Sequence, residues 1–309
     1  MPPAVLQRLI DGPDVWLAGM ARMFRAQQAE NEGHLDQVRS DVRAALECFA
    51  RAGDRWGPAK ALPLRALIRQ YDGDLDGALA DLDRAKRLAR EFGSLSPGDE
   101  IFVDLRLVDL HARLGDTARA AEMIAVARER ALRSAAPETA ILLDAREAAL
   151  WVHAGDPARA RELVESAEAG LTEQVMFDGD QGQALVGAAR GTLCLELGDG
   201  PGAEEAMGRA YAAAVDSGDL PIVATVAVAV AGLAALYGRH RDAAVLLGAA
   251  ARLRGAHDRT DPQVRALSGR SRAALGDERF AEAYESGWCL AAAAALVRAD
   301  PLGAREGRG

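Results

Sequence analysis

Five arginines recur along the first two thirds of the chain at intervals of roughly forty residues, and each precedes a glycine by eight or nine residues. They are Arg25, Arg65, Arg106, Arg146 and Arg190. A guanidinium group presents a planar fork of N–H donors that matches a carboxylate or a phosphate. Five such groups along one groove would therefore bind acidic groups of a partner. Because eight and nine residues differ by about 100° around a helix, the five need not share a face. The alternative is that they pair with acids of the chain itself, such as Asp104, Asp144 or Glu147.

No other arrangement of residues in the chain is typical of catalysis or of cofactor binding. The only lysines, Lys60 and Lys86, complete no GxxxxGK[ST] loop, and there is no GxSxG, no HExxH and no GxGxxG that follows a strand. The histidines lack metal-ligand spacing, and the three cysteines form no CxxC pair. We therefore expect no catalytic residues, no cofactor and no metal, and packing or surface roles for these side chains: His34, His111, His153, His240, His257, Cys48, Cys194 and Cys289.

Seven glycines divide the chain into repeats separated by 40, 42, 40, 43, 40 and 38 residues. They are Gly33, Gly73, Gly115, Gly155, Gly198, Gly238 and Gly276. Five, nine and twelve residues after each glycine, the first six repeats carry a small or apolar residue, and this spacing places the three on one helix face. The three positions hold Val38, Val42, Ala45; Ala78, Leu82, Ala85; Ala120, Ile124, Ala127; Ala160, Val164, Ala167; Ala203, Met207, Ala210; and Ala243, Leu247, Ala250. In the seventh repeat they are Ala281, Glu285 and Trp288, a departure expected of a terminal cap.

Each repeat is therefore predicted to be a helix, a tight turn and a second helix. Glycine ends the first helix in the left-handed conformation, and an aspartate such as Asp74, Asp116, Asp156 or Asp277 follows it as the cap of the next helix. One helix pair cannot bury its own apolar face, so a period near forty predicts an all-α solenoid of about seven repeats resembling tetratricopeptide repeats. We expect it to span residues 14–299, after an N-terminal extension (1–13) and before a frayed tail (300–309), with a loop within 171–183. In such arrays the first helix of each pair lines a concave groove, which is where the arginines would act.

The segment from 220 to 238 is uncharged and nearly long enough to span a membrane. It stays in register with the repeat, which favours a buried helix over a membrane span. Val226, Val230 and Leu233 in this segment would then either line an apolar groove for a partner's helix or close against the seventh repeat.

The overall charge limits the classes of partner. A net charge of −9 and an isoelectric point near 5.2 argue against a nucleic-acid-binding surface over the whole chain. The N-terminus lacks the charged and apolar regions of a signal peptide, and the odd, scattered cysteines fit a reducing cytoplasm.

Four stretches resemble one group of proteins. They are PDVWLAGMARMF (13–24), CFARAGDRWGPAKAL (48–62), YGRHRDAAVLLGAAARLRGAHD (237–258) and ALGDERFAEAYESGWCLAAAAAL (274–296). Together they are similar to the C-terminal tetratricopeptide region of AfsR-like Streptomyces antibiotic regulatory proteins and of related signal-transducing ATPases, including large LuxR-type regulators. The motifs Gly53–Gly57 and Leu246–Ala250 carry most of the resemblance.

The resemblance implies a non-catalytic module of an actinobacterial transcription regulator that senses a signal or partner and restrains a nucleotide-binding switch. The partner would be a protein or peptide, for instance the regulator's own nucleotide-binding domain, or a small-molecule effector. The chain has no P-loop and no winged-helix segment, so we expect either a module of a larger regulator or a stand-alone adaptor. A helical enzyme is a third hypothesis, and a pocket holding strongly perturbed titratable groups would favour it.

Overall fold

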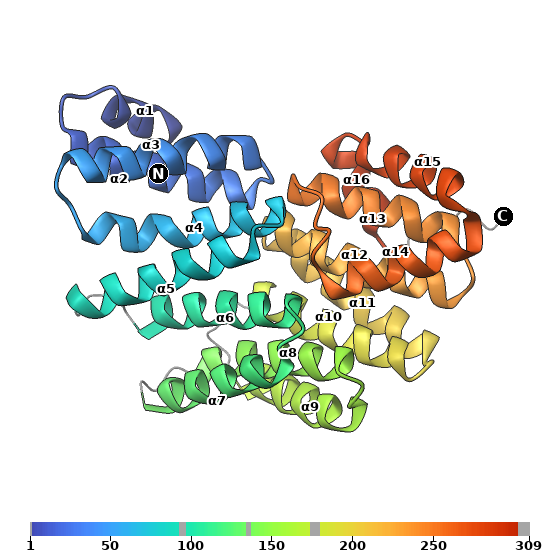
Figure 1. The fold of residues 1–309 in the computed structure, drawn as a ribbon. Helices are drawn as coiled ribbons and strands as arrows, with labels where there is room; N and C mark the ends of the chain where they lie inside the picture. Colours follow the sequence, from blue (N-terminus) through green and yellow to red (C-terminus); the bar gives the residue numbers. More distant parts are fainter. Residues whose placement is uncertain (1, 93–96, 134–136, 174–179, 302–309) are drawn as a thin grey trace. The chain divides into compact units, whose positions relative to one another are not determined.

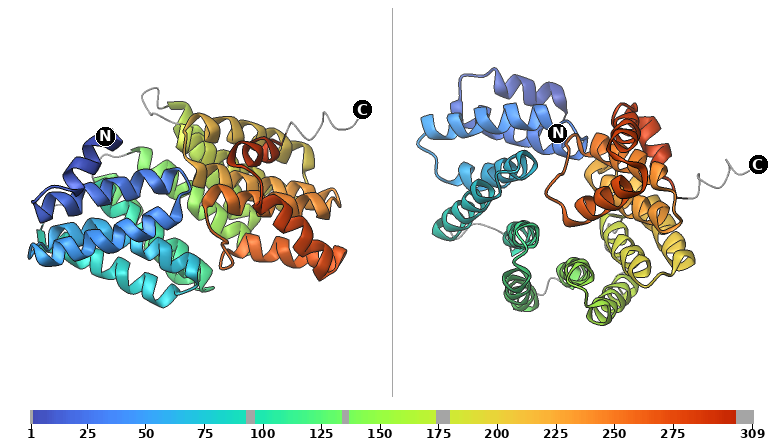
Figure 2. Two further views of the ribbon diagram at one scale, coloured as in Figure 1. Left: turned by 90° about the horizontal axis from the view of Figure 1, so that it is seen from above. Right: turned by 45° about the vertical axis from the view of Figure 1, so that its right-hand side comes forward.

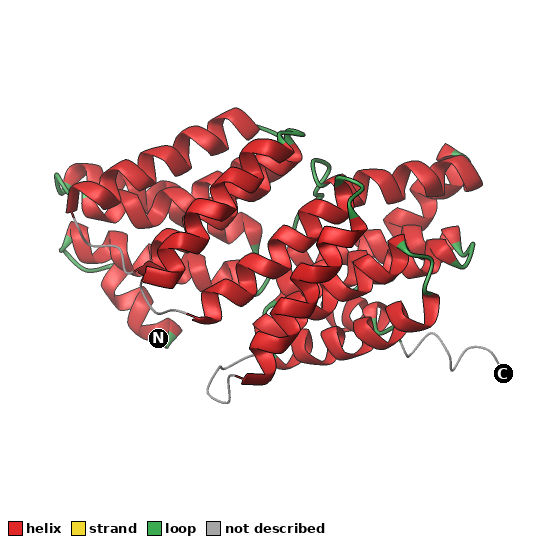
Figure 3. Ribbon diagram, turned by 90° about the horizontal axis from the view of Figure 1, so that it is seen from below, coloured by secondary structure: helices red, strands yellow, loops and turns green. Residues whose placement is uncertain are grey.

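The computed structural model describes residues 2–92, 97–133, 137–173 and 180–301, and all regular secondary structure in these residues is α-helix (Figures 1 and 3). Fourteen of the sixteen helices in these ranges form seven consecutive helix-turn-helix pairs, as the sequence predicts. The pairs are α2 (Val15–Asn31) with α3 (Leu35–Arg51), α4 (Trp56–Asp72) with α5 (Leu75–Phe92), α6 (Pro97–Arg113) with α7 (Thr117–Arg133), α8 (Pro137–His153) with α9 (Pro157–Glu173), α10 (Asp180–Glu196) with α11 (Gly200–Asp216), α12 (Leu220–Leu236) with α13 (His240–Arg254), and α14 (Pro262–Leu275) with α15 (Asp277–Trp288). The fold is an all-α helical repeat resembling a tetratricopeptide-type solenoid.

The predicted turns and apolar positions are confirmed in the first six repeats. All seven turn glycines have a positive φ, between 67° and 85°, which a residue with a Cβ rarely adopts. All eighteen side chains at the five-, nine- and twelve-residue positions of these repeats are buried. Asp74, Asp116 and Asp156 each accept a hydrogen bond from a backbone N–H of the helix that follows, over 2.9 to 3.1 Å. Small residues at the crossings let neighbouring helices approach closely.

The seventh repeat differs by a shift of one residue. Gly276, with φ 82° and ψ 159°, ends α14 and also begins α15, so Asp277 is the first residue of the helix rather than its cap. The buried positions shift as well, but not uniformly. Phe280, Ala283 and Gly287 are buried, one, two and one residues before positions 281, 285 and 288, and Ala281 is exposed. Ala281 and Glu285 are exposed and Trp288 is half-buried, so the seventh repeat departs from the pattern of the other six, as expected of a terminal repeat.

The chain divides into two compact units, Met1–Met123 and Ile124–Gly309, and the boundary between them falls within α7. In the N-terminal unit α2 and α3 lie side by side, as do α4 and α5, in each view (Figures 1 and 2). The ring of Phe49 on α3 packs where a Cβ on Gly57 of α4 would lie, only 2.5 Å away. Residues 1–13, predicted as an extension, contain a helix, α1 (Pro3–Ile10), whose Leu6 is fully buried.

The core of the C-terminal unit is built around α12, the uncharged segment noted in the sequence. This helix is buried on nearly all sides, as predicted for an all-round apolar helix in a protein core. Among the described residues, no helix is both long enough and apolar enough to cross a membrane. A last helix, α16 (Ala292–Ala299), which the repeat pattern does not predict, packs on α12 and α13 through Ala295 and Ala299. Residues 174–179, within the predicted loop, and 302–309, in the predicted tail, lie outside the described residues.

Candidate functional site

The five recurring arginines separate into two groups according to their distance from the turn glycine. The three that stand eight residues before it each hold a carboxylate with two guanidinium nitrogens. Arg25 donates to Asp41 over 2.7 and 2.6 Å, and Arg65 donates to Asp81 over 2.8 and 2.6 Å. Arg190 donates through Nε to Glu168 over 3.0 Å and makes a second bond through Nη2. Each pair joins two neighbouring helices. Arg25 and Arg65 link the two helices of one repeat, whereas Arg190 on α10 links its repeat to α9 of the preceding repeat.

The carboxylates of the first two pairs are buried. The side chain of Asp41 has no exposed surface, and that of Asp81 is 5% exposed. Asp41 also accepts a hydrogen bond from Gln37 over 2.8 Å and lies 3.7 Å from Arg22. The hydrogen bond to Asp41 raises the pKa of Arg25 above its usual value, and burial opposes this only in part. A buried carboxylate needs such partners because an unpaired buried charge costs several kcal/mol.

The two arginines that stand nine residues before the glycine are Arg106 and Arg146. Arg106 on α6 donates to Glu30 on α2 over 2.8 Å, a contact between first helices that lie two repeats apart. Arg146 is half-buried and also takes part in an interaction. Within the N-terminal unit, Arg106 therefore reaches an acid two repeats away, whereas Arg25 and Arg65 hold acids of their own repeats. Their predicted role in binding a partner stays a prediction.

The acids suggested as internal partners of these arginines are Asp104, Asp144 and Glu147, and each accepts a hydrogen bond from another cation. Asp104 accepts from Lys86 over 2.6 Å, which links α5 to α6. Arg128 on α7 holds both Asp144 and Glu147 on α8. These contacts join consecutive pairs, whereas those of Arg25 and Arg65 lie within a pair.

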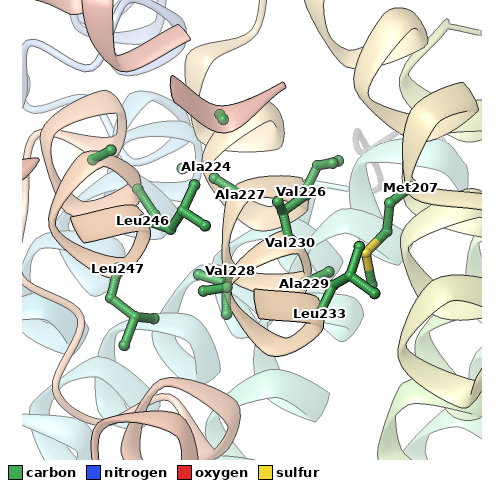
Figure 4. Packing of buried hydrophobic residues seen from close by; sticks show 14 of the residues in the cluster. Met207, Ala224, Val226, Ala227, Val228, Ala229, Val230, Leu233, Leu246 and Leu247 are labelled. Carbon is green, nitrogen blue, oxygen red and sulfur yellow. The ribbon is translucent and has the colours of Figure 1, made fainter. Parts of the chain in front are cut away.

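The apolar groove predicted on α12 is not open. Val226, Val230 and Leu233 are at most 6% exposed and lie in the core with side chains such as Met207 (Figure 4). Because α11, α13, α14 and α16 all pack against α12, these residues have no accessible surface for a partner. Of the two alternatives for these residues, burial therefore contradicts the open groove, and the three side chains lie in the closed core of the C-terminal unit.

Among the described residues, the thiols and histidines do not assemble into a reactive centre. Burial raises the pKa of the Cys194 thiol, and a hydrogen bond to Glu285 raises that of Cys289, so neither forms the thiolate readily. His257 lies 2.9 Å from the Tyr284 hydroxyl and 4.1 Å, between ring centroids, from Trp288, and burial lowers its pKa. The same part of the chain holds no group of three or more His, Cys, Asp or Glu placed to bind a metal ion.

A hollow of about 400 Å³ lies within the N-terminal unit, between α5 and the turn that joins α3 to α4. We call it the arginine hollow; its lining residues are Asp54, Arg55, Pro58, Arg84, Arg87, Leu88 and Glu91. The four from α5 follow the spacing i, i+3, i+4, i+7 and so share one face of that helix. The other three come from the turn and from the first residues of α4.

Three guanidinium groups face two carboxylates in the arginine hollow. Asp54 caps α4 by accepting from the N–H groups of Trp56 and Gly57 over 3.2 and 2.7 Å. Arg55 donates to Glu91 over 2.7 Å. The sequence pattern does not reveal this site, because the site joins residues about thirty positions apart that do not recur with the repeat. The motif that includes Gly53 and Gly57 was the only local signal near it.

Comparisons with known proteins assign no family. No family model matches the chain, and no curated protein matches it. The structure is similar to the crystal structure of BtubC (BKLC) from P. vanneervenii, with a TM-score of 0.45 and 19% sequence identity, over 81% of this chain and 91% of that one.

Proposed function

We propose that this chain is a non-catalytic protein-interaction module of a cytoplasmic bacterial transcription regulator. It would sense a signal or a protein partner and restrain, or relay that signal to, a nucleotide-binding switch and a DNA-binding domain. The observation that carries the interaction function is the fold: stacked helix pairs present extended faces to partners, and such arrays commonly bind proteins or peptides. The regulator context is supported by the sequence motifs of residues 53–57 and 246–250 alone.

The absence of catalysis belongs to the same proposal. The two thiols whose pKa is raised are held in the unreactive form, and the best-placed guanidinium groups are occupied by buried carboxylates. A mechanism consistent with this is differential binding. A ligand that prefers one state of the module shifts the population of that state, and it can shift the switch by no more than that difference in affinity.

The first experiment determines the size of the native product with an antibody raised against this chain. A band far above 32.6 kDa in a lysate of the source cells supports a module of a multidomain regulator. A band at 32.6 kDa favours the second candidate, a stand-alone adaptor.

A second experiment tests the relay to the switch. The chain is tagged and isolated, with cross-linking, and its partners are identified by mass spectrometry. Recovery of a nucleotide-binding or DNA-binding polypeptide, whose ATP hydrolysis changes when the purified chain is added, supports the proposal. If no such polypeptide is recovered from cells that express the regulator, the regulator context is wrong.

A further inference from the structure

The arginine hollow holds two cationic groups that the fold does not use. Arg84 and Arg87 are exposed on α5, and neither has a hydrogen-bond or ion-pair partner among the described residues. This contrasts with Arg25 and Arg65, each of which holds a carboxylate through two hydrogen bonds. Like charges three residues apart on a helix repel each other, so an anionic ligand would relieve a cost that the free chain bears.

The acids of the hollow are already engaged. Asp54 is bound to two backbone N–H groups of α4, and Glu91 to Arg55. Any further anion in the hollow would therefore meet Arg84 and Arg87 without displacing an existing contact. This local excess of positive charge occurs in a chain whose net charge is −9.

The remaining walls of the hollow are apolar. Pro58, at the start of α4, and Leu88, beside Arg87 on α5, are both half-buried. A volume of about 400 Å³ accommodates a few side chains, which is more than a small inorganic ion fills. Two cationic side chains beside an apolar wall suit a short peptide segment in which carboxylates flank an apolar side chain.

We propose that the arginine hollow binds an acidic segment of a protein partner, with carboxylates on Arg84 and Arg87 and an apolar side chain against Pro58 and Leu88. The inference rests on the proposed interaction function and adds the chemistry of the partner. A nucleic acid is the less favoured polyanion, because the negative charge of the whole chain repels a long phosphate backbone far more than a short acidic segment.

The test is a fluorescence anisotropy titration of the purified full chain with a labelled short peptide of alternating glutamate and leucine. The same peptide with glutamine in place of glutamate is the ligand control. The double variant Arg84→Ala/Arg87→Ala removes the two unused cations. The matched protein control is Arg270→Ala/Arg279→Ala, which removes the same charge from two exposed arginines of the C-terminal unit. Because all four side chains are exposed, neither variant should unfold the chain.

We expect the glutamate peptide to bind more tightly than the glutamine peptide. The Arg84/Arg87 variant should weaken binding about tenfold, which corresponds to ~1.4 kcal/mol, and the control variant less than about twofold. Equal losses in both variants would show that only the net charge matters, and this would refute the proposal. Failure of the glutamate peptide to bind also refutes it, as does a single-stranded oligonucleotide that binds more tightly through the same arginines.

The outcome is separable from that of the proposed function. If the cross-linked partner is still recovered with the Arg84/Arg87 variant at full yield, the interaction function stands and the hollow is not its site. If the peptide binds at the hollow while no nucleotide-binding or DNA-binding polypeptide is recovered, the site stands and the regulator context fails.

Discussion

Replacement of Gly248 by alanine should destabilise the C-terminal unit, because α13 and α15 touch backbone to backbone at this residue. A Cβ on Gly248 would lie 2.0 Å from the carbonyl oxygen of Tyr284, and a Cβ on Gly287 would lie 2.0 Å from that of Val245. Ordinary contact begins near 3.4 Å, and the obstructing atoms are backbone atoms that no side-chain rotation can move. The two helices must therefore separate by about 1.4 Å at their closest point.

The magnitude follows from two opposing effects. Overpacking a well-packed core costs about 1–3 kcal/mol, and a backbone clash of this depth belongs at the upper end. Alanine in the middle of a helix gains about 0.5–1 kcal/mol over glycine. The clash therefore wins, and Gly248→Ala should lower the free energy of unfolding by about 2 kcal/mol.

The chain offers a matched control on the neighbouring helix. Gly269 lies within α14, is exposed, and has nothing within 4 Å of an added Cβ. Gly269→Ala should therefore stabilise the protein by about 0.5–1 kcal/mol. Urea unfolding followed by circular dichroism measures both variants, and hydrogen exchange across α15 locates the change for Gly248→Ala. If both substitutions stabilise the chain, the helices do not cross at Gly248 and the packing argument is wrong.

Three further predictions concern a buried pair, a histidine and a turn. Arg25→Ala should lower the free energy of unfolding by about 2 kcal/mol, because it leaves the buried carboxylate of Asp41 with fewer partners. Arg209→Ala, which breaks an exposed ion pair with Glu205, should lower it by less than about 0.5 kcal/mol. Equal urea midpoints for the two variants would contradict this. His257 has its pKa lowered from 6.5, chiefly by burial. As the pH falls, the unfolded chain therefore takes up the proton before the folded chain does. The contribution of His257 to stability is intact above pH 6.5 and declines as the pH falls through 6.5 toward the folded pKa. Urea titrations of His257→Phe over the same pH range should lack this dependence. Gly276→Ala should lower the free energy of unfolding by about 2–3 kcal/mol, because the φ and ψ of Gly276 lie in a region that only glycine populates. Gly155→Ala should lower it by only ~1 kcal/mol. Thermal melting of the two variants side by side checks this order.

The repeat was predictable because its signals are local and periodic. Each repeat has three small or apolar residues at fixed distances from its turn glycine. This spacing places them on one face of a helix, independently of the rest of the fold. The seventh repeat shows the limit of this argument. In sequence, its Gly276–Asp277 pair resembles the other turns, but Gly276 is the N-cap of α15 and Asp277 is the first residue of that helix. The cap is decided by backbone angles, which residue types alone do not determine.

The arginines were found from the sequence, but their partners were not. The distance of eight or nine residues from the glycine separates Arg25, Arg65 and Arg190 from Arg106, and this difference was visible in the sequence. The acid that each arginine contacts depends on how consecutive helix pairs stack, and this stacking is a long-range property of the fold. The exposed positions of Arg84 and Arg87 likewise acquire meaning only when the turn after α3 comes to face α5.

The pairing of charges in this fold supplies a criterion for where partners bind. Arg25 and Arg65 join the helices within a pair, and Lys86 and Arg128 join one pair to the next. These cations lie beside buried or nearly buried carboxylates. If a partner bound one of the cations, the carboxylate would be left in the core without its counter-charge, at a cost of several kcal/mol. That cost is subtracted from the binding free energy of the ligand, and each ~1.4 kcal/mol of it weakens binding tenfold. Partners should therefore be held by cations that no carboxylate of the chain requires, and the arginine hollow brings two of them, Arg84 and Arg87, to one face of α5.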